Sequence, residues 1–131
     1  MIIDDETPSS HLTKLMLREL LGQACEILVF DRAEHALAHM VSSPPRLPEL
    51  ILLDINLRGM GSFEFVEMLE AHPGLHAHHI PIIMISTVVA DRDMERAGQF
   101  ASIKGVEEKP FTIEEMQALL LKYFPDLSLS E

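Results

Sequence analysis

The chain has 131 residues, enough for one ordinary domain and too few for a second of similar size. Apolar residues make up 47% of it, but no apolar run reaches the roughly 18 residues that indicate a membrane span, so a membrane protein is not expected. The formal net charge of −11 repels phosphate backbones and argues against direct binding of DNA or RNA by this domain.

The first half of the chain alternates short apolar runs with amphipathic stretches. Only three residues precede Asp4, so the first strand is expected to be unusually short or to begin upstream of this sequence. The predicted elements are a strand over 1–3, a helix over about 10–21, a strand over 26–30, a helix over 33–41, a loop over 42–48, and a strand over 50–53 that ends at Asp54.

The second half continues the alternation. Pro73 and Gly74 are expected to break the helix before them, and Thr112 with Glu115 forms a capping box that predicts the start of the last helix. The predicted elements are a helix over 63–69, a strand over 80–85, a polar helix over 91–101, a strand over 106–108 and a helix over 112–124.

Strands that alternate with helices predict a parallel sheet with helices on both faces. The runs ILLD and IPIIMIS are apolar throughout, as expected for strands buried on both sides. The predicted fold is an α/β three-layer sandwich around a five-stranded parallel sheet, flavodoxin-like in winding, with strand order 2-1-3-4-5. One domain is expected over residues 1–125, and residues 126–131 are interpreted as a frayed tail or the start of a linker.

Polar residues follow four of the predicted strands. Asp4 and Asp5, Asp54, Ser86, and Lys109 each stand at a carboxyl end of a strand, the edge where open parallel sheets bind ligands. Three carboxylates in one cleft repel each other, and a hard cation such as Mg²⁺ relieves that repulsion while keeping waters that suit a phosphate. Metal, lysine and hydroxyl together fit phosphoryl transfer, with an aspartate as nucleophile.

At this point the sequence resembles a known family. The segments Ile2-Ile3-Asp4-Asp5-Glu6, Leu50-Ile51-Leu52-Leu53-Asp54-Ile55-Asn56, Met84-Ile85-Ser86 and Lys109-Pro110-Phe111 are similar to those of response-regulator receiver domains of two-component systems. Each motif alone is weak, because acidic pairs and Lys-Pro dipeptides are common. The four in order, covering nearly the whole chain, carry the resemblance.

The resemblance implies a role for each motif residue. It makes Asp54 the phosphoacceptor and a metal ligand, and the Lys109–Pro110 peptide bond is expected to be cis. The remaining implied roles are direct Mg²⁺ ligation by Asp5, Mg²⁺ contact through water by Asp4, Mg²⁺ ligation by the Asn56 backbone carbonyl, and phosphoryl binding by Ser86 and Lys109.

Several positions depart from the family pattern. Val106 stands where receivers often carry an aromatic switch residue, and segments 57–62 and 101–103 replace the usual Met-Pro-Gly-x-Asp-Gly and Ala-Gly-Ala stretches. Val88 and Asn56 lie where receivers tune the lifetime of the phosphoryl group. Because Val88 offers no group to orient a water, a long-lived phosphoryl state is expected.

The expected function is signal transfer. The domain is not expected to be an enzyme, except that it would assist its own phosphorylation and dephosphorylation. A sensor histidine kinase or a phosphotransfer protein would donate the phosphoryl group. Movement of Ser86 toward Asp54 would then bias the surface formed by the segments 91–101, 106–108 and 112–124 toward a downstream protein or an output domain. The single cysteine, Cys25, and the acidic N-terminus favour a reducing, cytoplasmic location.

Other readings fit the residues less well. A receiver-like binding module that works without phosphorylation is the main alternative, motivated by the altered switch residues. A haloacid-dehalogenase-like phosphohydrolase would need a second acid where Asn56 stands, and a flavodoxin would need a Ser/Thr- and Gly-rich turn where Asp-Asp-Glu follows the first strand. A zinc or nickel site is conceivable at the histidines 72, 76, 78 and 79, but their spacing matches no closed tetrahedral pattern.

Overall fold

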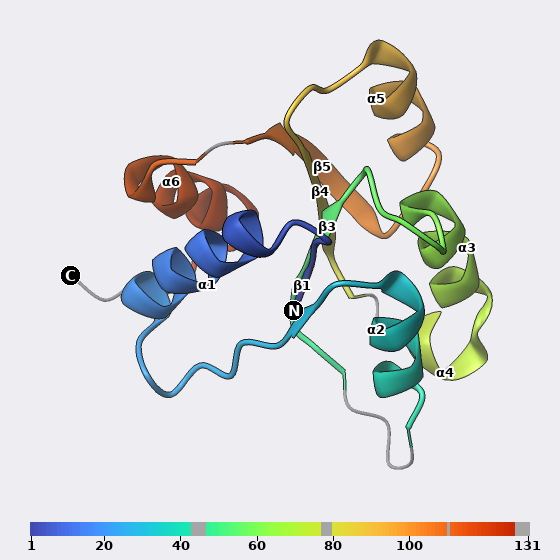
Figure 1. The fold of residues 1–131 in the computed structure, drawn as a ribbon, viewed down its shortest axis with the longest axis horizontal. Coiled ribbons are helices and arrows are strands. Elements are labelled where there is room, and N and C mark those ends of the chain that lie inside the picture. Colours follow the sequence, from blue (N-terminus) through green and yellow to red (C-terminus); the bar gives the residue numbers. More distant parts are fainter. Residues whose placement is uncertain (43–46, 77–79, 110, 128–131) are drawn as a thin grey trace.

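The computed structural model describes residues 1–42, 47–76, 80–109 and 111–127, and its centre is a five-stranded parallel sheet (Figure 1). The strands lie in the order β2-β1-β3-β4-β5, and this confirms the predicted order. Their bounds are β1 Ile2–Ile3, β2 Val29–Phe30, β3 Ile51–Asp54, β4 Ile82–Ser86 and β5 Ile103–Glu108.

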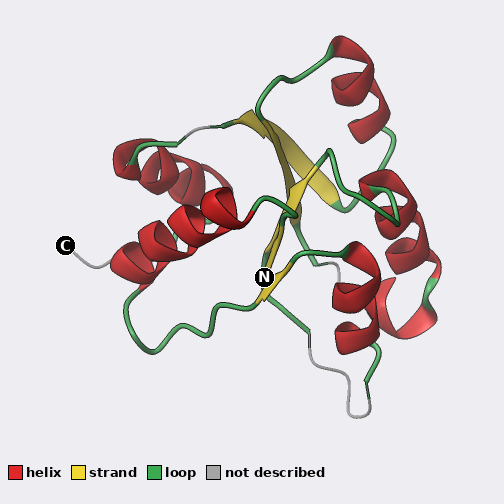
Figure 2. Cartoon of the chain, in the orientation of Figure 1, coloured by secondary structure: helices red, strands yellow, loops and turns green. Residues whose placement is uncertain are grey.

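Helices cover both faces of this sheet, as predicted. Helices α1 and α6 lie on one face, and α2, α3, α4 and α5 lie on the other (Figure 2). Their bounds are α1 Thr7–Leu21, α2 Ala33–Met40, α3 Ser62–Ala71, α4 Pro73–His76, α5 Asp91–Ala97 and α6 Ile113–Tyr123. Among the residues that the structure describes, no helix is long and apolar enough to cross a membrane.

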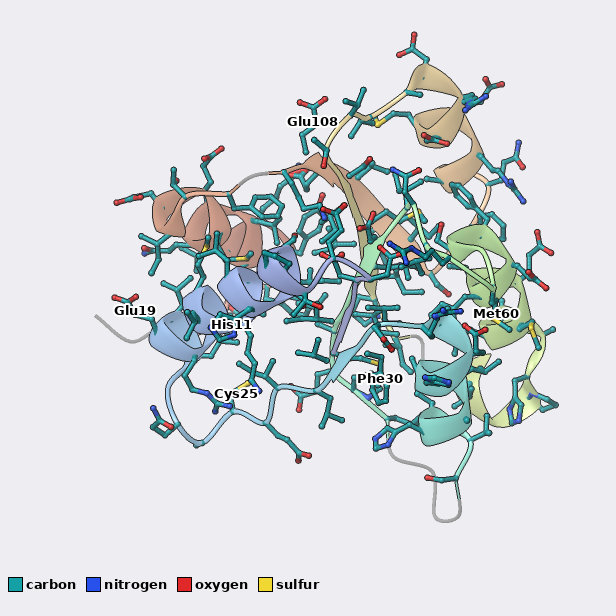
Figure 3. All side chains as sticks on the ribbon, in the orientation of Figure 1. His11, Glu19, Cys25, Phe30, Met60 and Glu108 are labelled. Atoms are coloured by element: carbon teal, nitrogen blue, oxygen red, sulfur yellow. The ribbon has the colours of Figure 1, made fainter. Side chains whose placement is uncertain are left out.

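The two central strands explain the wholly apolar runs in the sequence. Every residue of β3 and β4 is buried, and successive side chains point to opposite faces of the sheet. Ile51 and Leu53 therefore pack with α2 and α3, whereas Leu52 packs with α1 and α6. Figure 3 shows side chains filling the space between the sheet and the helices on both sides. These two apolar layers fix the strands in register, so the carboxyl ends of the strands are held at one edge.

Several element bounds differ from the prediction. Strand β2 covers two residues rather than five, because the two residues of β1 are its partners in the sheet. Strand β5 begins at Ile103 rather than at residue 106, because β4 offers pairing along its whole length. Helix α5 ends at Ala97, and Phe100 then turns back to stack on Phe63 instead of continuing the helix.

The helix ends are partly as expected. The capping box of Thr112 and Glu115 is present, with both of its hydrogen bonds formed. Helix α1 starts at Thr7 rather than near residue 10, because Pro8 suits the first turn of a helix. Helix α3 ends before Pro73 as predicted, and one further turn, α4, follows. Leu127 was expected in a frayed tail but packs against the core beside α6.

Candidate functional site

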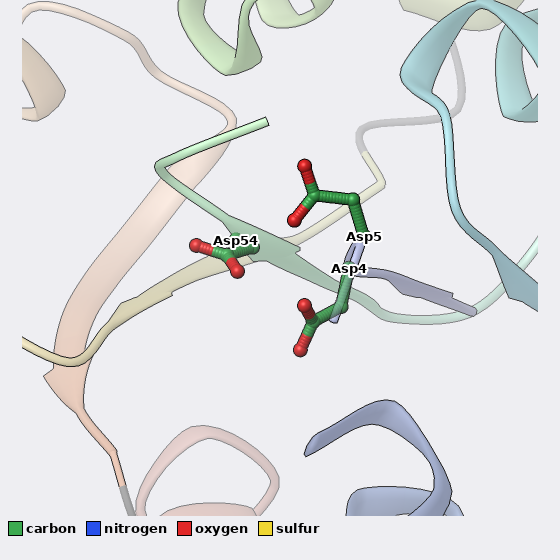
Figure 4. A group of neighbouring side chains, drawn as sticks. All are labelled: Asp4, Asp5 and Asp54. Atoms are coloured by element: carbon green, nitrogen blue, oxygen red, sulfur yellow. The ribbon is translucent and has the colours of Figure 1, made fainter. Parts of the chain in front are cut away.

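The three carboxylates gather because β1 and β3 are parallel neighbours. The pairing of Ile3 with Leu53 places the next residue of each strand, Asp4 and Asp54, side by side at the carboxyl edge. Asp4, Asp5 and Asp54 each bring a carboxylate oxygen within 4.8 Å of the others (Figure 4). Asp4 is only 1% exposed and Asp54 only 2% exposed, so two of these charges are almost entirely out of water.

Lys109 supplies the opposite charge. It follows β5, and its backbone N–H donates to Ser86 O over 2.8 Å, which extends the pairing of β5 with β4. Its Nζ lies 3.2 Å from Oδ2 of Asp4 and 3.2 Å from Oδ2 of Asp54. A third acceptor is Ser9 Oγ at 3.1 Å, so all three hydrogen-bonding directions of the ammonium are used.

Burial, hydrogen bonds and neighbouring charges all act on the pKa values of this cluster. Burial raises the pKa of Asp54 to about 6, although the hydrogen bond from the Asn56 N–H and the charge of Lys109 act in the other direction. Burial also disfavours ionised Asp4, but the Glu6 N–H, the carboxyl of Asp54 and Lys109 outweigh it and hold the pKa of Asp4 below its usual value. Burial acts against the Lys109 ammonium, yet the two carboxylates outweigh it and raise its pKa.

Asp5 lies at the outer side of the cluster. Its side chain is 12% exposed, and its Oδ2 accepts the backbone N–H of Arg58 at 3.0 Å. The Arg58 Nε lies 3.7 Å from the same oxygen. The next residue, Gly59, has φ +75, a left-handed conformation that glycine adopts at little cost, and this turns the loop back toward α3.

Asn56 and Ser86 connect the acidic cluster to β4. The Asn56 N–H donates to Asp54 Oδ1 at 3.0 Å, and its side-chain Nδ2 donates to Ser86 Oγ at 3.2 Å. The hydroxyl of Ser86 in turn donates to the carbonyl of Val88 at 2.9 Å. Ser86 is fully buried, so its hydroxyl is held between these two partners at the carboxyl end of β4.

The structure thus brings the predicted residues Asp4, Asp5, Asp54 and Lys109 together, with Asn56 and Ser86 beside them. Sequence reasoning missed Ser9 and the contact of Arg58 with Asp5. Starting α1 at Pro8 would have placed Ser9 in the first turn, next to the strand edge. The departure of Arg58 from the usual proline was the available signal for the second contact.

The structure describes two of the other predicted positions, Val106 and Val88. Val106 lies half-buried in β5 and packs against the core on the side of α3, and Val88 is 73% exposed. The expected cis bond between Lys109 and Pro110 involves a residue outside the described ones. Likewise, the possible zinc or nickel site rests on His78, His79 and the side chain of His76, which lie outside what the structure describes.

The donor set fits a small divalent cation. Carboxylate oxygens are the ligands that Mg²⁺ and Mn²⁺ prefer, and three of them converge here. Lys109 carries one positive charge against three carboxylates, so it offsets only part of their negative charge. A divalent cation would supply the missing positive charge without requiring any carboxyl to take up a proton.

A family model, the response regulator receiver domain, matches residues 1–121 of the chain. The chain belongs to the response regulator receiver family. Receiver domains are signalling modules rather than conventional enzymes, they bind a divalent metal ion, and they interact with histidine kinases or phosphotransfer proteins. A sequence comparison with curated proteins finds no match.

Solved structures support the fold of this receiver domain. The Mn²⁺-bound response regulator Rcp1 is 17% identical, with a TM-score of 0.77 over 99% of this chain and 96% of that one. The phosphorylated cyanobacterial phytochrome response regulator RcpA is 17% identical, with a TM-score of 0.78 over 99% and 96%. A two-component response regulator from Cytophaga hutchinsonii is 20% identical, with a TM-score of 0.76 over 95% of each chain.

Proposed function

We propose that this receiver domain accepts a phosphoryl group on Asp54, in a site that holds Mg²⁺, and that phosphorylation switches a surface for protein interaction. The single observation that supports this most is the position of Lys109 Nζ, 3.2 Å from both Asp4 and Asp54, beside the three gathered carboxylates. A buried cluster of this kind, with one cation and excess negative charge, suits a nucleophilic aspartate and a metal.

The chemistry is a transfer between two proteins. A carboxylate oxygen of Asp54 attacks the phosphorus of a phosphohistidine on a sensor histidine kinase or phosphotransfer protein. A new P–O bond forms, the P–N bond breaks, and the histidine leaves with the electron pair and takes up a proton. Bound Mg²⁺, held directly by Asp5, Asp54 and the Asn56 carbonyl and through water by Asp4, would neutralise charge on the phosphoryl oxygens.

The chain's own residues prepare Asp54 for attack. The Asn56 N–H holds Oδ1, and Lys109 pairs with Oδ2, so the carboxylate is oriented before the donor arrives. After transfer, Lys109 is free to pair with the phosphoryl group, because its ammonium already lies within hydrogen-bonding distance of the accepting side chain. The same arrangement would assist the later hydrolysis of the phosphoryl group.

The switch proposed for this domain begins at Ser86. Its hydroxyl now donates to the carbonyl of Val88, and it would exchange that partner for a phosphoryl oxygen on Asp54. The loop after β4 would move with it, and this would change the surface formed by α5, β5 and α6. A downstream protein or an output domain would bind that surface. The receiver would then span residues 1–125, with 126–131 as a tail or linker, in a cytoplasmic protein.

The test is phosphorylation by a small-molecule donor. Acetyl phosphate with MgCl₂ is expected to add one phosphoryl group, read by intact mass, and chelation of the metal should abolish the reaction. Asp54→Asn should prevent it, whereas Asp31→Asn, which removes an exposed carboxyl after β2, should leave it unchanged. An unmodified protein would favour the alternative, a binding module that works without phosphorylation, which the half-buried Val106 at the aromatic switch position motivates.

A further inference from the structure

Arg58 contacts the acidic cluster from outside and has no part in the phosphoryl transfer described above. Its backbone N–H donates to Asp5 Oδ2 at 3.0 Å, and its guanidinium Nε lies 3.7 Å from that same oxygen. Asp5 is the more exposed of the gathered carboxylates, at 12% for its side chain. One oxygen of the carboxylate proposed to bind Mg²⁺ directly is therefore already engaged by an arginine.

The loop sequence makes this contact possible. Receivers usually carry proline where Arg58 stands, and proline has neither a backbone N–H nor a charge. An arginine at this position provides both, and the left-handed turn at Gly59 directly after it shapes the loop that carries it. The contact with Asp5 is thus a property of this chain's own substitution.

Arg58 also changes the balance of charge at the site. Lys109 offsets one of the three negative charges, and Arg58 lies near enough to offset part of a second. A cation entering the site meets less attraction than it would with a neutral residue at position 58. The side chain of Arg58 is 80% exposed, so it can move aside into solvent and is expected to weaken binding rather than to prevent it.

We infer that Arg58 sets the metal affinity of this receiver by competing with the divalent cation for Asp5. The inference rests on the proposed metal site and adds a residue that determines its affinity. Arg58 acts on the metal through Asp5 and through charge, so its effect should follow the charge at position 58. In the absence of metal the arginine pairs with Asp5, and a cation bound by Asp5 would compete with the guanidinium for that carboxylate.

The test is titration of the full chain with MgCl₂ followed by calorimetry, using variants at position 58. Arg58→Met is expected to bind Mg²⁺ about three- to ten-fold more tightly than the wild type, and Arg58→Glu more tightly still. Arg58→Lys should stay within about two-fold of the wild type, since it keeps the charge. Because Arg58 is highly exposed, these variants should fold normally, which thermal melting checks.

A matched control separates the local effect from net charge. Lys104 is exposed and lies near the amino end of β5, away from the carboxyl ends of the strands where the acidic cluster lies. Lys104→Met makes the same change in net charge, yet at physiological salt it should alter the Mg²⁺ affinity less than about two-fold, because charges beyond about 8 Å are screened. A tightening by Lys104→Met equal to that of Arg58→Met would overturn the inference.

Two further results distinguish this inference from the proposed function. If the wild type binds Mg²⁺ and Asp5→Asn abolishes the binding, but Arg58→Met and Arg58→Glu leave the affinity unchanged or weaken it, only the role of Arg58 is wrong. If the wild type shows no saturable Mg²⁺ binding and none appears in Arg58→Glu, the proposed metal site fails and the inference fails with it.

Discussion

Lys109 reaches across a whole strand to pair with Asp54. Lys109 follows β5 and Asp54 ends β3, with β4 between them in the sheet, yet Nζ lies 3.2 Å from Oδ2. The same ammonium contacts Asp4 beyond β1. Three strands therefore depend on one cation for the neutralisation of two carboxylates that are almost completely buried, and the stability of this edge should depend strongly on that cation.

Replacing this lysine should destabilise the domain. Lys109→Met leaves two buried carboxylates without their cation, and the expected loss is about 2–4 kcal/mol in the free energy of unfolding at neutral pH without metal. Chemical denaturation in EDTA measures it. Lys104→Met, which removes an exposed charge from β5, the strand that Lys109 follows, should cost less than about 0.5 kcal/mol.

The double variant Lys109→Met with Asp54→Asn tests whether charge is the cause. Asp54→Asn should stabilise the Lys109→Met variant by at least about 1 kcal/mol more than it stabilises the wild type, and this excess is the coupling expected of residues in direct contact. An equal effect of Asp54→Asn in both backgrounds would mean that Lys109 stabilises the fold through packing of its aliphatic chain and not through its pairing with Asp54.

Asp54 itself should be a source of instability in the metal-free protein. Burial raises its pKa to about 6 from an ordinary 3.8, so the folded state holds this proton more tightly than the unfolded state does. Stability from this group is therefore present below pH 4 and is lost as the pH rises to about 6. Asp54→Asn removes the penalty and should stabilise the protein by about 1–3 kcal/mol at pH 7.5.

Chemical denaturation across pH 4 to 8 with EDTA tests the direction of this effect. The difference in the free energy of unfolding between Asp54→Asn and the wild type should grow up to about pH 6 and then level off. Added MgCl₂ should reduce this difference in stability, because it should stabilise the wild type alone. Asp31→Asn, at an exposed position, is the control. An Asp54→Asn variant that is less stable than the wild type at pH 7.5 would contradict the prediction.

The sequence predicted the central part of the site because one rule covers it. Parallel strands end at one edge, so residues directly after apolar runs meet there, and this rule brought Asp4, Asp54 and Lys109 together. The contacts of Ser9 and Arg58 escaped the same reasoning, since they depend on where α1 begins and on how the loop after β3 turns. Neither feature follows from strand periodicity, and both are set by local backbone geometry at Pro8 and Gly59.

In the fold, likewise, the order of the strands was predicted correctly and the bounds of several elements were not. Alternation and right-handed crossovers restrict a parallel sheet to a few doubly wound strand orders, and the flavodoxin-like order among them is the one that the structure has. The lengths of β2 and β5 depend instead on how many residues the neighbouring strand offers, and no local pattern encodes that. The short helix α4 after Pro73 was missed because proline ends one helix and also suits the first turn of the next.

Gly105 in β5 offers a stability prediction that is independent of the site. A Cβ at this position would overlap the hydroxyl and ring of Tyr123 at the end of α6. Gly105→Ala should therefore cost about 1–3 kcal/mol, because the rigid ring must move. Gly98→Ala is the control, since a Cβ there meets its nearest atom at an ordinary 3.5 Å, and it should change stability by less than about 0.5 kcal/mol.

A second substitution identifies the cause of that loss. In a Tyr123→Leu background the overlap is removed, and Gly105→Ala should then cost at least about 0.5 kcal/mol less than it does in the wild type. An equal cost in both backgrounds would indicate that the strand conformation of Gly105, rather than Tyr123, excludes a side chain.

The lifetime of the phosphoryl group should be long and should depend on Val88. This residue lies two positions after Ser86, is 73% exposed, and has no polar group to orient a water for attack on the phosphorus. Val88→Gln supplies an amide at the same place and should shorten the half-life about two- to ten-fold.

The half-life is measured by intact mass, which follows the loss of the phosphoryl group after removal of excess acetyl phosphate. Val41→Gln makes the same change at the end of α2 and should have no effect. A wild-type half-life of seconds, or equal half-lives for the wild type and Val88→Gln, would show that the lack of a polar group at position 88 does not set the lifetime.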